Sequence, residues 1–497
     1  MQAADVLTVL PELVLLAAAC ALVLMEAFVK TGGEGRVDRT AMVAVALTGL
    51  LASAGVALGL WGEERLSFSG MVVLDKWAVF FKVLFAVGAA LTVLMSPGYL
   101  EAHQRHLGEY YALVLFAVIG MDLMAAARDF ILLYVAIELM AISSYLLAAF
   151  FRYRVRSNEA SLKYLVTGSF ASAILLYGVS LVYGLTGGTG YESSGAVLAS
   201  LGGVGAGANG TGVAFAMALV AIGLAFKVSA APFHMWTPDA YQGAPTPIAA
   251  FFSVGPKAAA FSAIMAAFIL AFPGTVGEWG VLFLVLSILT MLVGNVYALV
   301  QKNVKRMLAY SSIAHAGYLL TGIAAMGWSG NSYPGRGVMV YLVAYTFMNL
   351  GAFGVLAYLK AQMPDKFDYS LKYFAGLGRR SPLAAILLTV FLISLTGIPG
   401  TAGFIGKFYV FGGVVWAGLW WLAVIGVVLS VVSAYYYLRV VMYMFFREPE
   451  EEYSVRESIS GGMACSLWVS AVATVAIGVV PSWLWDAVVG AFGTLFS

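Results

Sequence analysis

Fourteen apolar segments, each about the length of a membrane-spanning helix, follow one another along the chain. A helix needs about 20 mostly apolar residues to cross the hydrocarbon core of a bilayer. The segments lie at residues 6–29, 40–61, 73–95, 110–127, 129–150, 159–185, 213–235, 248–272, 277–300, 306–327, 337–361, 382–415, 416–446 and 460–489. This pattern predicts an all-α polytopic membrane protein with about fourteen transmembrane helices.

Composition supports the same class and excludes others. The 497-residue chain is 62% hydrophobic and 10% charged, whereas about 25% of residues are charged in an ordinary soluble domain. The net charge of +2 is spread over many short loops, so the sequence predicts contact with the lipid bilayer and no nucleic-acid partner. The first residues, MQAAD, lack a basic start, which favours a retained first span over a cleaved signal peptide.

The distribution of lysine and arginine predicts the orientation. With the N-terminus outside, the odd-numbered loops hold seventeen basic residues, whereas the even-numbered loops hold three, which are Arg65, Arg128 and Arg336. Because basic residues concentrate in cytoplasmic loops, both termini are predicted to lie outside. The Gly- and Ser-rich stretch 186–212 is expected to be a flexible loop.

Two of the segments carry helix-breaking residues next to a lysine. The seventh contains Lys227 and breaks at Pro232, and the twelfth breaks at TGIPGTAG around Pro399, before Lys407. The breaks lie five spans apart, and an odd separation inverts the second copy relative to the first. We therefore expect two inverted five-helix repeats, 109–272 and 273–446, after three N-terminal helices in 1–108 and before one C-terminal helix in 447–497. The alternative is that Pro and Gly are simply common in membrane helices.

Ionisable side chains inside the segments are the candidate functional residues. They are Glu138, Lys163, Lys227, Lys257, His315 and Lys407. Each charged group at a helix centre costs at least about 2.5 to 3.5 kcal/mol, so five would cost above roughly 12 kcal/mol. That cost rivals a net stability of roughly 5 to 15 kcal/mol. We therefore expect these side chains to face the interior of the bundle, to pair and to be hydrated.

Simpler interpretations stay open for several of these residues. Glu138 could form a structural salt bridge with Lys227 or Lys163. Lys163 enters its span less deeply and could extend to the membrane interface. His315 could be a satisfied core histidine. Lys82, like Lys76, lies nearer a helix end and is interpreted as an interfacial anchor.

The predominance of buried lysines favours proton transfer along a line. Burial disfavours the charged form of a lysine, and a nearby glutamate favours it. Moving the glutamate, or charging the next lysine, would therefore move a proton from one lysine to another.

Five stretches carry a resemblance to a known family. QKNVKRMLAYSSIAHAGY at 301–318 resembles the antiporter-like membrane subunits shared by respiratory complex I and multisubunit cation/proton antiporters. Within that group, four stretches resemble the N-subunit family of proton-pumping NADH:quinone oxidoreductase. They are PELVLL at 11–16, SNEASLKYLVTGSFASAILLYG at 157–178, PFHMWTPDAYQGAPTP at 232–247 and IPGTAGFIGKFYVF at 398–411.

The resemblance implies a role for each candidate. Glu138 matches the family's fifth-helix glutamate, and Lys227 matches its seventh-helix lysine. Lys163, Lys257 and Lys407 match the sixth-, eighth- and twelfth-helix lysines, and His315 matches a polar axis position. Lysine stands at position 257 where histidine is expected in some relatives.

The implied function is proton translocation by a membrane-arm subunit that has no redox centre or cofactor of its own. FMN, iron–sulfur clusters and quinone would bind other subunits of the complex. The implied partners are other membrane-arm subunits, including paralogous antiporter-like subunits, in a bacterial inner membrane. Three alternatives remain: a subunit of a multisubunit Na⁺/H⁺ antiporter, a subunit of a related complex with another electron donor such as ferredoxin, and a structural scaffold.

Overall fold

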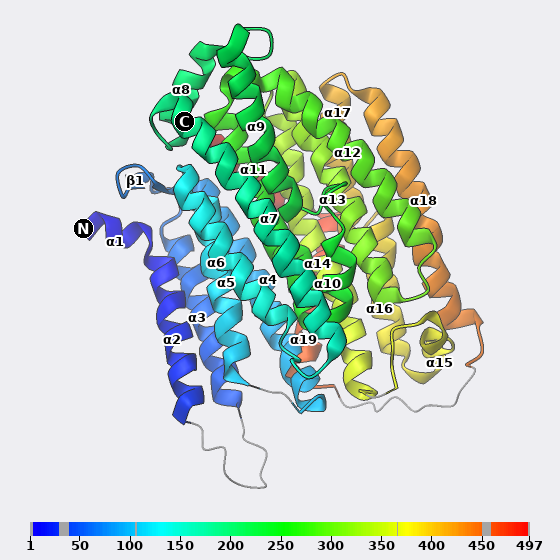
Figure 1. Cartoon of the computed structure of the whole chain (residues 1–497). Coiled ribbons are helices and arrows are strands. Elements are labelled where there is room, and N and C mark those ends of the chain that lie inside the picture. The colour runs from blue at the N-terminus through cyan, green and yellow to red at the C-terminus, as the bar shows by residue number, and fades with distance from the viewer. Residues whose placement is uncertain (1–2, 29–38, 105–106, 365, 450–458, 496–497) are drawn as a thin grey trace.

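A computed structural model describes residues 3–28, 39–104, 107–364, 366–449 and 459–495. Long helices run side by side, and one small β-hairpin lies near the N-terminus (Figure 1). The first elements are α1 (Ala3–Thr8), α2 (Leu10–Phe28), α3 (Thr40–Gly59), β1 (Arg65–Ser67), β2 (Val72–Leu74) and α4 (Lys76–Ala102). The next are α5 (Gly108–Ala126), α6 (Phe130–Ala148), α7 (Val155–Thr186), α8 (Tyr191–Leu201), α9 (Gly207–Lys227), α10 (Trp236–Gly243) and α11 (Thr246–Ala271). The last are η1 (Pro273–Thr275), α12 (Val276–Leu299), α13 (Val304–Ser329), α14 (Tyr333–Gln362), η2 (Leu371–Phe374), α15 (Leu377–Arg380), α16 (Pro382–Thr396), α17 (Ala402–Trp416), α18 (Trp420–Phe446), α19 (Gly461–Val479) and α20 (Ser482–Gly493).

The helices confirm the predicted class of membrane protein. Among the described residues, 12 helices are long and apolar enough to cross a membrane. α13 has 26 residues but a more polar sequence, and α16 and α17, with 15 residues each, together form one further segment. These segments match the fourteen that the sequence predicts.

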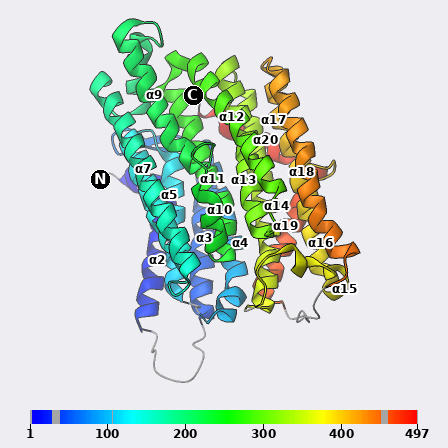
Figure 2. The ribbon, with the colours of Figure 1, turned by 45° about the vertical axis from the view of Figure 1, so that its right-hand side comes forward.

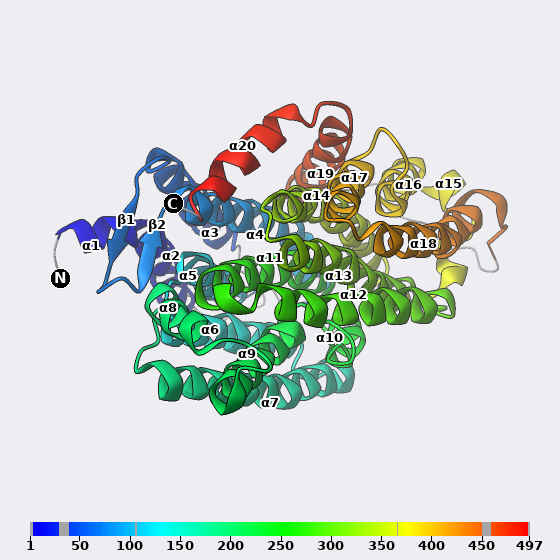
Figure 3. The same cartoon turned by 90° about the horizontal axis from the view of Figure 1, so that it is seen from above.

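The interior of the bundle is formed by α11, α13 and α14, which bury most of their side chains. Seen from above, they lie between α2 and α3 at one end and α18 at the other, with α7 and α9 along one side (Figure 3). A view from another side places α16, α17 and α18 away from α2 and α7 (Figure 2). A side chain on α11 or α13 is therefore surrounded by protein, which a buried polar group requires.

Both predicted helix breaks are present. Residues 228–235 separate α9 from α10, and residues 397–401 separate α16 from α17. Gly397 ends α16 with φ +91°, a left-handed conformation that glycine adopts without steric cost. The inverted relation between residues 109–272 and 273–446 stays a prediction.

The expectation of a flexible loop over 186–212 is wrong, because α8 forms within it. α8 packs against α11 so closely that a Cβ on Gly195 would collide with the carbonyl oxygen of Leu270. Backbone hydrogen bonds also fix its start, since Phe130 N donates to Thr189 O at 2.9 Å and Tyr191 N to Arg128 O at 2.8 Å. Glycine here permits close packing of helices, which composition alone does not reveal.

Four of the basic residues behind the predicted orientation, Lys30, Arg36, Arg105 and Arg456, lie outside the described residues. The sides of the membrane that the two termini face stay a prediction.

Candidate functional site

The first broken helix places Lys227 in the protein interior. Lys227 is the last residue of α9, and 3% of it is exposed. Side chains satisfy backbone groups freed by the break, since Trp236 Nε1 donates to Phe226 O at 3.2 Å and Ala231 N donates to Thr290 Oγ1 at 2.9 Å. The ammonium of Lys227 itself has no hydrogen-bond partner among the described residues. The structure therefore leaves one buried amine next to the break unsatisfied.

Glu138 lies on the neighbouring helix α6, eight residues after its start, which is about 12 Å along the helix axis. Its carboxylate acts electrostatically on Lys227, but its Oε1 is buried without a hydrogen-bond partner in the described part of the chain. Among the described residues, the ammonium of Lys227 and Glu138 Oε1 thus form no hydrogen bond with each other.

Lys163 lies near the surface, with 46% of its side chain exposed. Its Nζ lies 2.6 Å from Glu159 Oε1 and 2.9 Å from Asp239 Oδ2, and Asp239 also pairs with Arg306 at 2.6 Å. These contacts join α7, α10 and α13. The position agrees with a lysine that enters its span less deeply than the others.

Lys257 occupies the centre of α11, directly after Pro256. Its Nζ donates to the carbonyl oxygen of Ser312 at 2.9 Å and to its hydroxyl at 2.5 Å. Ser312 lies on α13, so this lysine connects the two central helices.

His315 continues the polar contacts along α13. Its Nδ1 lies 2.5 Å from the hydroxyl of Tyr341, and its Nε2 lies 3.2 Å from the hydroxyl of Tyr437. Tyr437 also contacts the hydroxyl of Ser311. Both ring nitrogens are therefore satisfied, but by hydroxyl groups that are themselves donors and acceptors.

A second group of hydroxyls surrounds Asn295 on α12. Asn295 Nδ2 donates to the hydroxyl of Tyr318 at 3.0 Å, and the hydroxyl of Tyr436 donates to Asn295 Oδ1 at 3.2 Å. The Nζ of Lys407 lies 5.1 Å from the centroid of the Tyr318 ring. The side chains between Lys257 and Lys407, which we call the central polar line, come from α11, α12, α13, α14 and α18: Lys257, Asn295, Ser311, Ser312, His315, Tyr318, Tyr341, Tyr436 and Tyr437.

Lys407, at the second break, is fully satisfied. From α17 it reaches back to the end of α16, where Nζ donates to Leu395 O at 3.0 Å and Thr396 O at 2.8 Å. It also donates to Ser430 Oγ on α18 at 2.6 Å. A cation at a helix C-terminus satisfies carbonyls that the helix leaves free.

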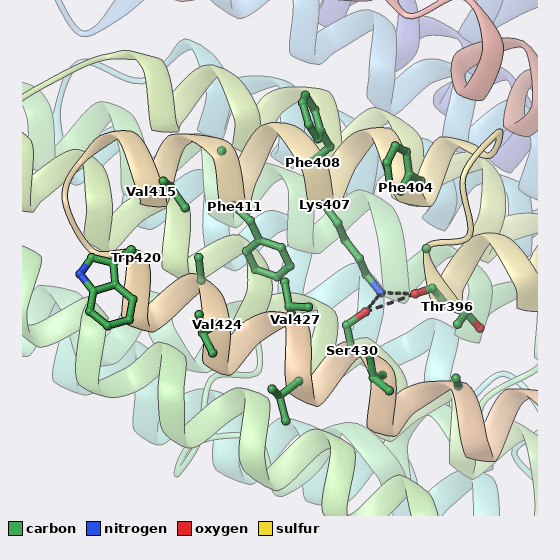
Figure 4. Close-up of a pocket in the computed structure, with 16 residues that line it drawn as sticks. Thr396, Phe404, Lys407, Phe408, Phe411, Val415, Trp420, Val424, Val427 and Ser430 are labelled. Carbon is green, nitrogen blue, oxygen red and sulfur yellow. Dashed lines mark hydrogen bonds between the residues drawn. The ribbon is translucent and has the colours of Figure 1, made fainter.

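A groove between α17 and α18 leads to this lysine (Figure 4). Its volume is about 700 Å³. Its walls are mostly apolar, with Phe408, Val424 and Val431 more than half exposed. Lys407, Ser430 and Thr396 form its polar end. The amine is thus reached from the outer face of the bundle as well as from the central polar line.

Residues 127–433 match the family model described as NADH:quinone oxidoreductase/Mrp antiporter, TM. The chain belongs to this family. The matched range includes all six candidate residues and every member of the central polar line except Tyr436 and Tyr437.

Curated members of the family are similar along nearly the whole chain. The chain is 44% identical over 482 residues to NADH-quinone oxidoreductase subunit N of Trichlorobacter lovleyi, which covers 97% of this chain and 96% of the relative. It is 41% identical to NADH-quinone oxidoreductase subunit N 2 of Rhizobium meliloti, with 95% of each chain covered.

Solved structures of the family have the same fold. A chain of respiratory complex I from Thermus thermophilus aligns with a TM-score of 0.77 at 34% identity, over 96% of this chain and 99% of that chain. An archaeal membrane-bound sulfane sulfur reductase aligns with a TM-score of 0.86 at 26% identity, over 98% and 97%. The Mrp complex from Dietzia aligns with a TM-score of 0.81 at 22% identity, over 100% and 98%, which shows the fold alone.

The hydroxyl and amide groups between the lysines were not predicted from the sequence. A signal was present on α13, where Ser311, His315 and Tyr318 are spaced at i, i+4 and i+7 and so share one helix face. The partners on α12, α14 and α18 carry no such signal, because only the tertiary packing brings them to that face.

Proposed function

We propose that this chain translocates protons as a membrane-arm subunit of an NADH:quinone oxidoreductase. The observation that carries the proposal is the buried set of lysine, serine, histidine and tyrosine contacts from Lys257 toward Lys407. These groups accept and donate protons. Relatives with the name NADH-quinone oxidoreductase subunit N support the assignment to that complex.

In the proposed mechanism, Lys227 and Glu138 form the first station. In the part of the chain that the structure describes, the buried ammonium of Lys227 has no hydrogen bond, so the charge of Glu138 is its main electrostatic support. A charge change that weakens this support releases the proton toward Lys257. Where neighbouring groups of the central polar line are too far apart for direct transfer, water molecules would bridge them.

Lys407 is the proposed exit gate toward the outside. It lies beyond the second break, and the carbonyl oxygens of Leu395 and Thr396 hold its ammonium in place. Arrival of a proton from the central polar line would charge Lys407, and release of a proton from Lys407 toward the outside would complete the transfer.

The remaining parts of the proposal concern the complex and the membrane. Quinone reduction in neighbouring subunits would supply the energy, and FMN, iron–sulfur clusters and quinone would bind there. The partners would be other membrane-arm subunits, including paralogous antiporter-like ones. The complex would lie in a bacterial inner membrane with both termini of this chain on the periplasmic side.

The test is quinone-coupled proton pumping by the assembled enzyme in vesicles. Lys227→Met and Glu138→Gln should impair pumping, whereas Lys76→Met, at the start of α4 and away from the central polar line, should pump normally. Co-purification of the partner subunits confirms assembly. Normal pumping by a fully assembled Lys227→Met enzyme would contradict the assignment.

The same vesicles separate the proposal from an antiporter function. A sodium-dependent pH gradient without quinone would favour a Na⁺/H⁺ antiporter subunit. The fold that this chain shares with the Mrp complex is the observation behind that alternative. Identification of flavin and iron–sulfur partner subunits would favour the oxidoreductase.

A further inference from the structure

A buried charged cluster lies apart from the central polar line, where α5 packs against both α2 and α4. Its members are Glu12 on α2, Lys82 on α4 and Asp122 on α5. Their exposed fractions are 5%, 1% and 1%. The interpretation of Lys82 as an interfacial anchor is therefore wrong, since its amine is enclosed by protein and lies 2.8 Å from Glu12 Oε1.

Asp122 has no comparable partner. Both of its carboxyl oxygens are buried without a hydrogen bond among the described residues. Its electrostatic neighbours are the carboxylate of Glu12 and the ammonium of Lys82. One cation thus faces two carboxyl groups inside the bundle.

Charge balance decides the state of this cluster. If all three groups were ionised, the cluster would carry one uncompensated negative charge in a buried position. An uncompensated buried charge costs several kcal/mol even after relaxation, and two carboxyl groups that share a site do not both ionise readily. One proton bound to the two carboxyl groups removes the excess charge.

Other charged groups on the packed helices do not balance the cluster. Of the elements that pack against α5, α3 and β2 carry no charged residue, and Glu26 at the far end of α2 pairs with Arg39 at 2.8 Å. Arg128, just beyond α5, pairs with Asp75 at 2.8 Å. Glu138 on α6 and Lys257 on α11 belong to the proposed proton path, and Lys76 and Glu101 lie at the two ends of α4.

Two buried hydroxyls connect the chain just before α2 to the β-hairpin. Thr8 ends α1, two residues before the start of α2, and Glu12 lies in the first turn of α2. Thr8 Oγ1 lies 2.8 Å from Ser67 Oγ at the end of β1, and both residues are buried. The hairpin turn that follows is exposed at Ser69 and Gly70. The chain that leads into α2 is thus held against the hairpin, next to its exposed turn.

We propose that Glu12, Lys82 and Asp122 form a proton-binding site, separate from the central polar line, which holds one proton and exchanges it with water at the hairpin. The only bond made or broken is the O–H bond of a carboxyl group, and the released proton goes to water. The proton at this site is measured in the resting enzyme, so the proposal does not rest on the proposed function.

Infrared difference spectra of the purified, assembled complex at rest provide the test. The spectrum of the wild type minus that of Asp122→Asn should contain the C=O band of a protonated carboxyl group. The control Glu63→Gln, in an exposed ion pair with Arg65, should change only carboxylate bands. A difference spectrum of Asp122→Asn with carboxylate bands alone would overturn the proposal.

Two further variants decide the matter if Asp122→Asn does not assemble. Glu12→Gln should lose the protonated-carboxyl band, because Lys82 then balances an ionised Asp122. Lys82→Met should strengthen the band, because no cation then balances either carboxyl group. The same direction of change in both variants would contradict the charge balance.

Transfer into D₂O tests the exchange. The protonated-carboxyl band should shift to lower frequency, because the bound hydrogen is replaced by deuterium. A band that stays in place would overturn the exchange of this proton with water. No NADH or quinone is added, so these outcomes are independent of whether Lys227→Met abolishes pumping.

Discussion

At the scale of single residues, the lysines at the two helix breaks have opposite surroundings. Lys227 has no hydrogen-bond partner within the described ranges, whereas Lys407 donates to two carbonyl oxygens and one hydroxyl. Sequence alone presents them as equivalent. A buried ammonium without partners depends on nearby charge, whereas one that binds helix-end carbonyls is held in place. The two positions are therefore suited to different steps, release at Lys227 and retention at Lys407.

Replacement of Lys407 should lower stability as well as proton pumping. Lys407→Met leaves the carbonyl oxygen of Leu395 without its side-chain donor, whereas Thr396 O keeps the hydroxyl of Ser430 at 3.2 Å. A buried unsatisfied polar group costs about 1 to 3 kcal/mol. Thermal unfolding of the purified chain in detergent measures this loss. Ser430→Ala removes the hydroxyl that accepts from Lys407 and donates to Thr396 O, but both carbonyl oxygens keep the ammonium as donor. It should therefore cost less, about 1 kcal/mol. Equal losses in the two variants would argue against the carbonyl contacts as the source.

Lys163 should matter less than Lys257. Lys163 is half exposed and pairs with Glu159 and Asp239, and exposed ion pairs contribute about 0 to 1 kcal/mol. Lys163→Met should therefore leave most of the pumping, whereas Lys257→Met should abolish it by removing the buried amine beside Ser312. Proton uptake per NADH oxidised compares the two variants. Loss of pumping in Lys163→Met alone would place the path at the surface of α7.

At the scale of elements, the second helix break offers a matched pair of glycines. Gly397 and Gly400 have φ of +91° and +86°, so alanine at either position costs roughly 1 to 2 kcal/mol in backbone strain. A Cβ on Gly397 would lie 2.9 Å from Lys407 Cδ, whereas one on Gly400 would meet no atom within 4 Å. Gly397→Ala should therefore impair pumping more than Gly400→Ala at similar thermal stability. Equal pumping would show that the position of Lys407 tolerates displacement.

The end of α4 should make stability depend on pH. Burial lowers the pKa of His103, the residue that follows α4, to about 4, and the positive charges of Arg154, Lys360 and Lys305 act in the same direction. The folded-state pKa therefore lies below the unfolded value of about 6.5. The stabilisation from a neutral His103 is complete above pH 6.5 and is lost as the pH falls toward 4.

The variant His103→Phe tests this dependence. Phenylalanine keeps a ring next to Tyr99 and Phe151, which stack on His103 with centroid distances of 4.4 and 5.1 Å. The thermal unfolding temperature should fall less between pH 7 and pH 5 in the variant than in the wild type. Parallel curves for the two proteins would contradict a neutral buried His103.

The sequence predicts the elements better than it predicts the contacts between them. The spans and both helix breaks follow from apolar length and from Pro232 and Pro399. α8 was missed because the glycines of 186–212 indicate flexibility in isolation but permit close packing in the bundle. The Lys82 contact with Glu12 was missed because the two residues lie on different helices. A lysine near a helix end can either extend to the membrane interface or pair with a carboxylate inside the protein, and the sequence does not distinguish the two.

At the scale of the whole molecule, we propose that residues 109–272 and 273–446 are inverted repeats. The two broken helices, α9 with α10 and α16 with α17, hold equivalent places in this scheme. An inverted pair would direct the two breaks, and hence Lys227 and Lys407, toward opposite faces of the membrane. A proton could then enter near one break and leave near the other without passing the same gate twice.

The orientation of the chain in the membrane decides whether a proton that leaves near Lys407 moves toward the outside. Tyr153 between α6 and α7 and Val204 between α8 and α9 are exposed, by 69% and 73%, and α7 lies between the two loops. If odd-numbered loops face the cytoplasm, cysteine at 204 reacts with a membrane-impermeant maleimide from the periplasmic side, whereas cysteine at 153 reacts only in inverted vesicles. The native Cys20 and Cys465 are exposed on α2 and α19, so both are first replaced by alanine. Labelling of Tyr153→Cys from the periplasmic side would reverse the orientation, and Lys407 would then open toward the cytoplasm.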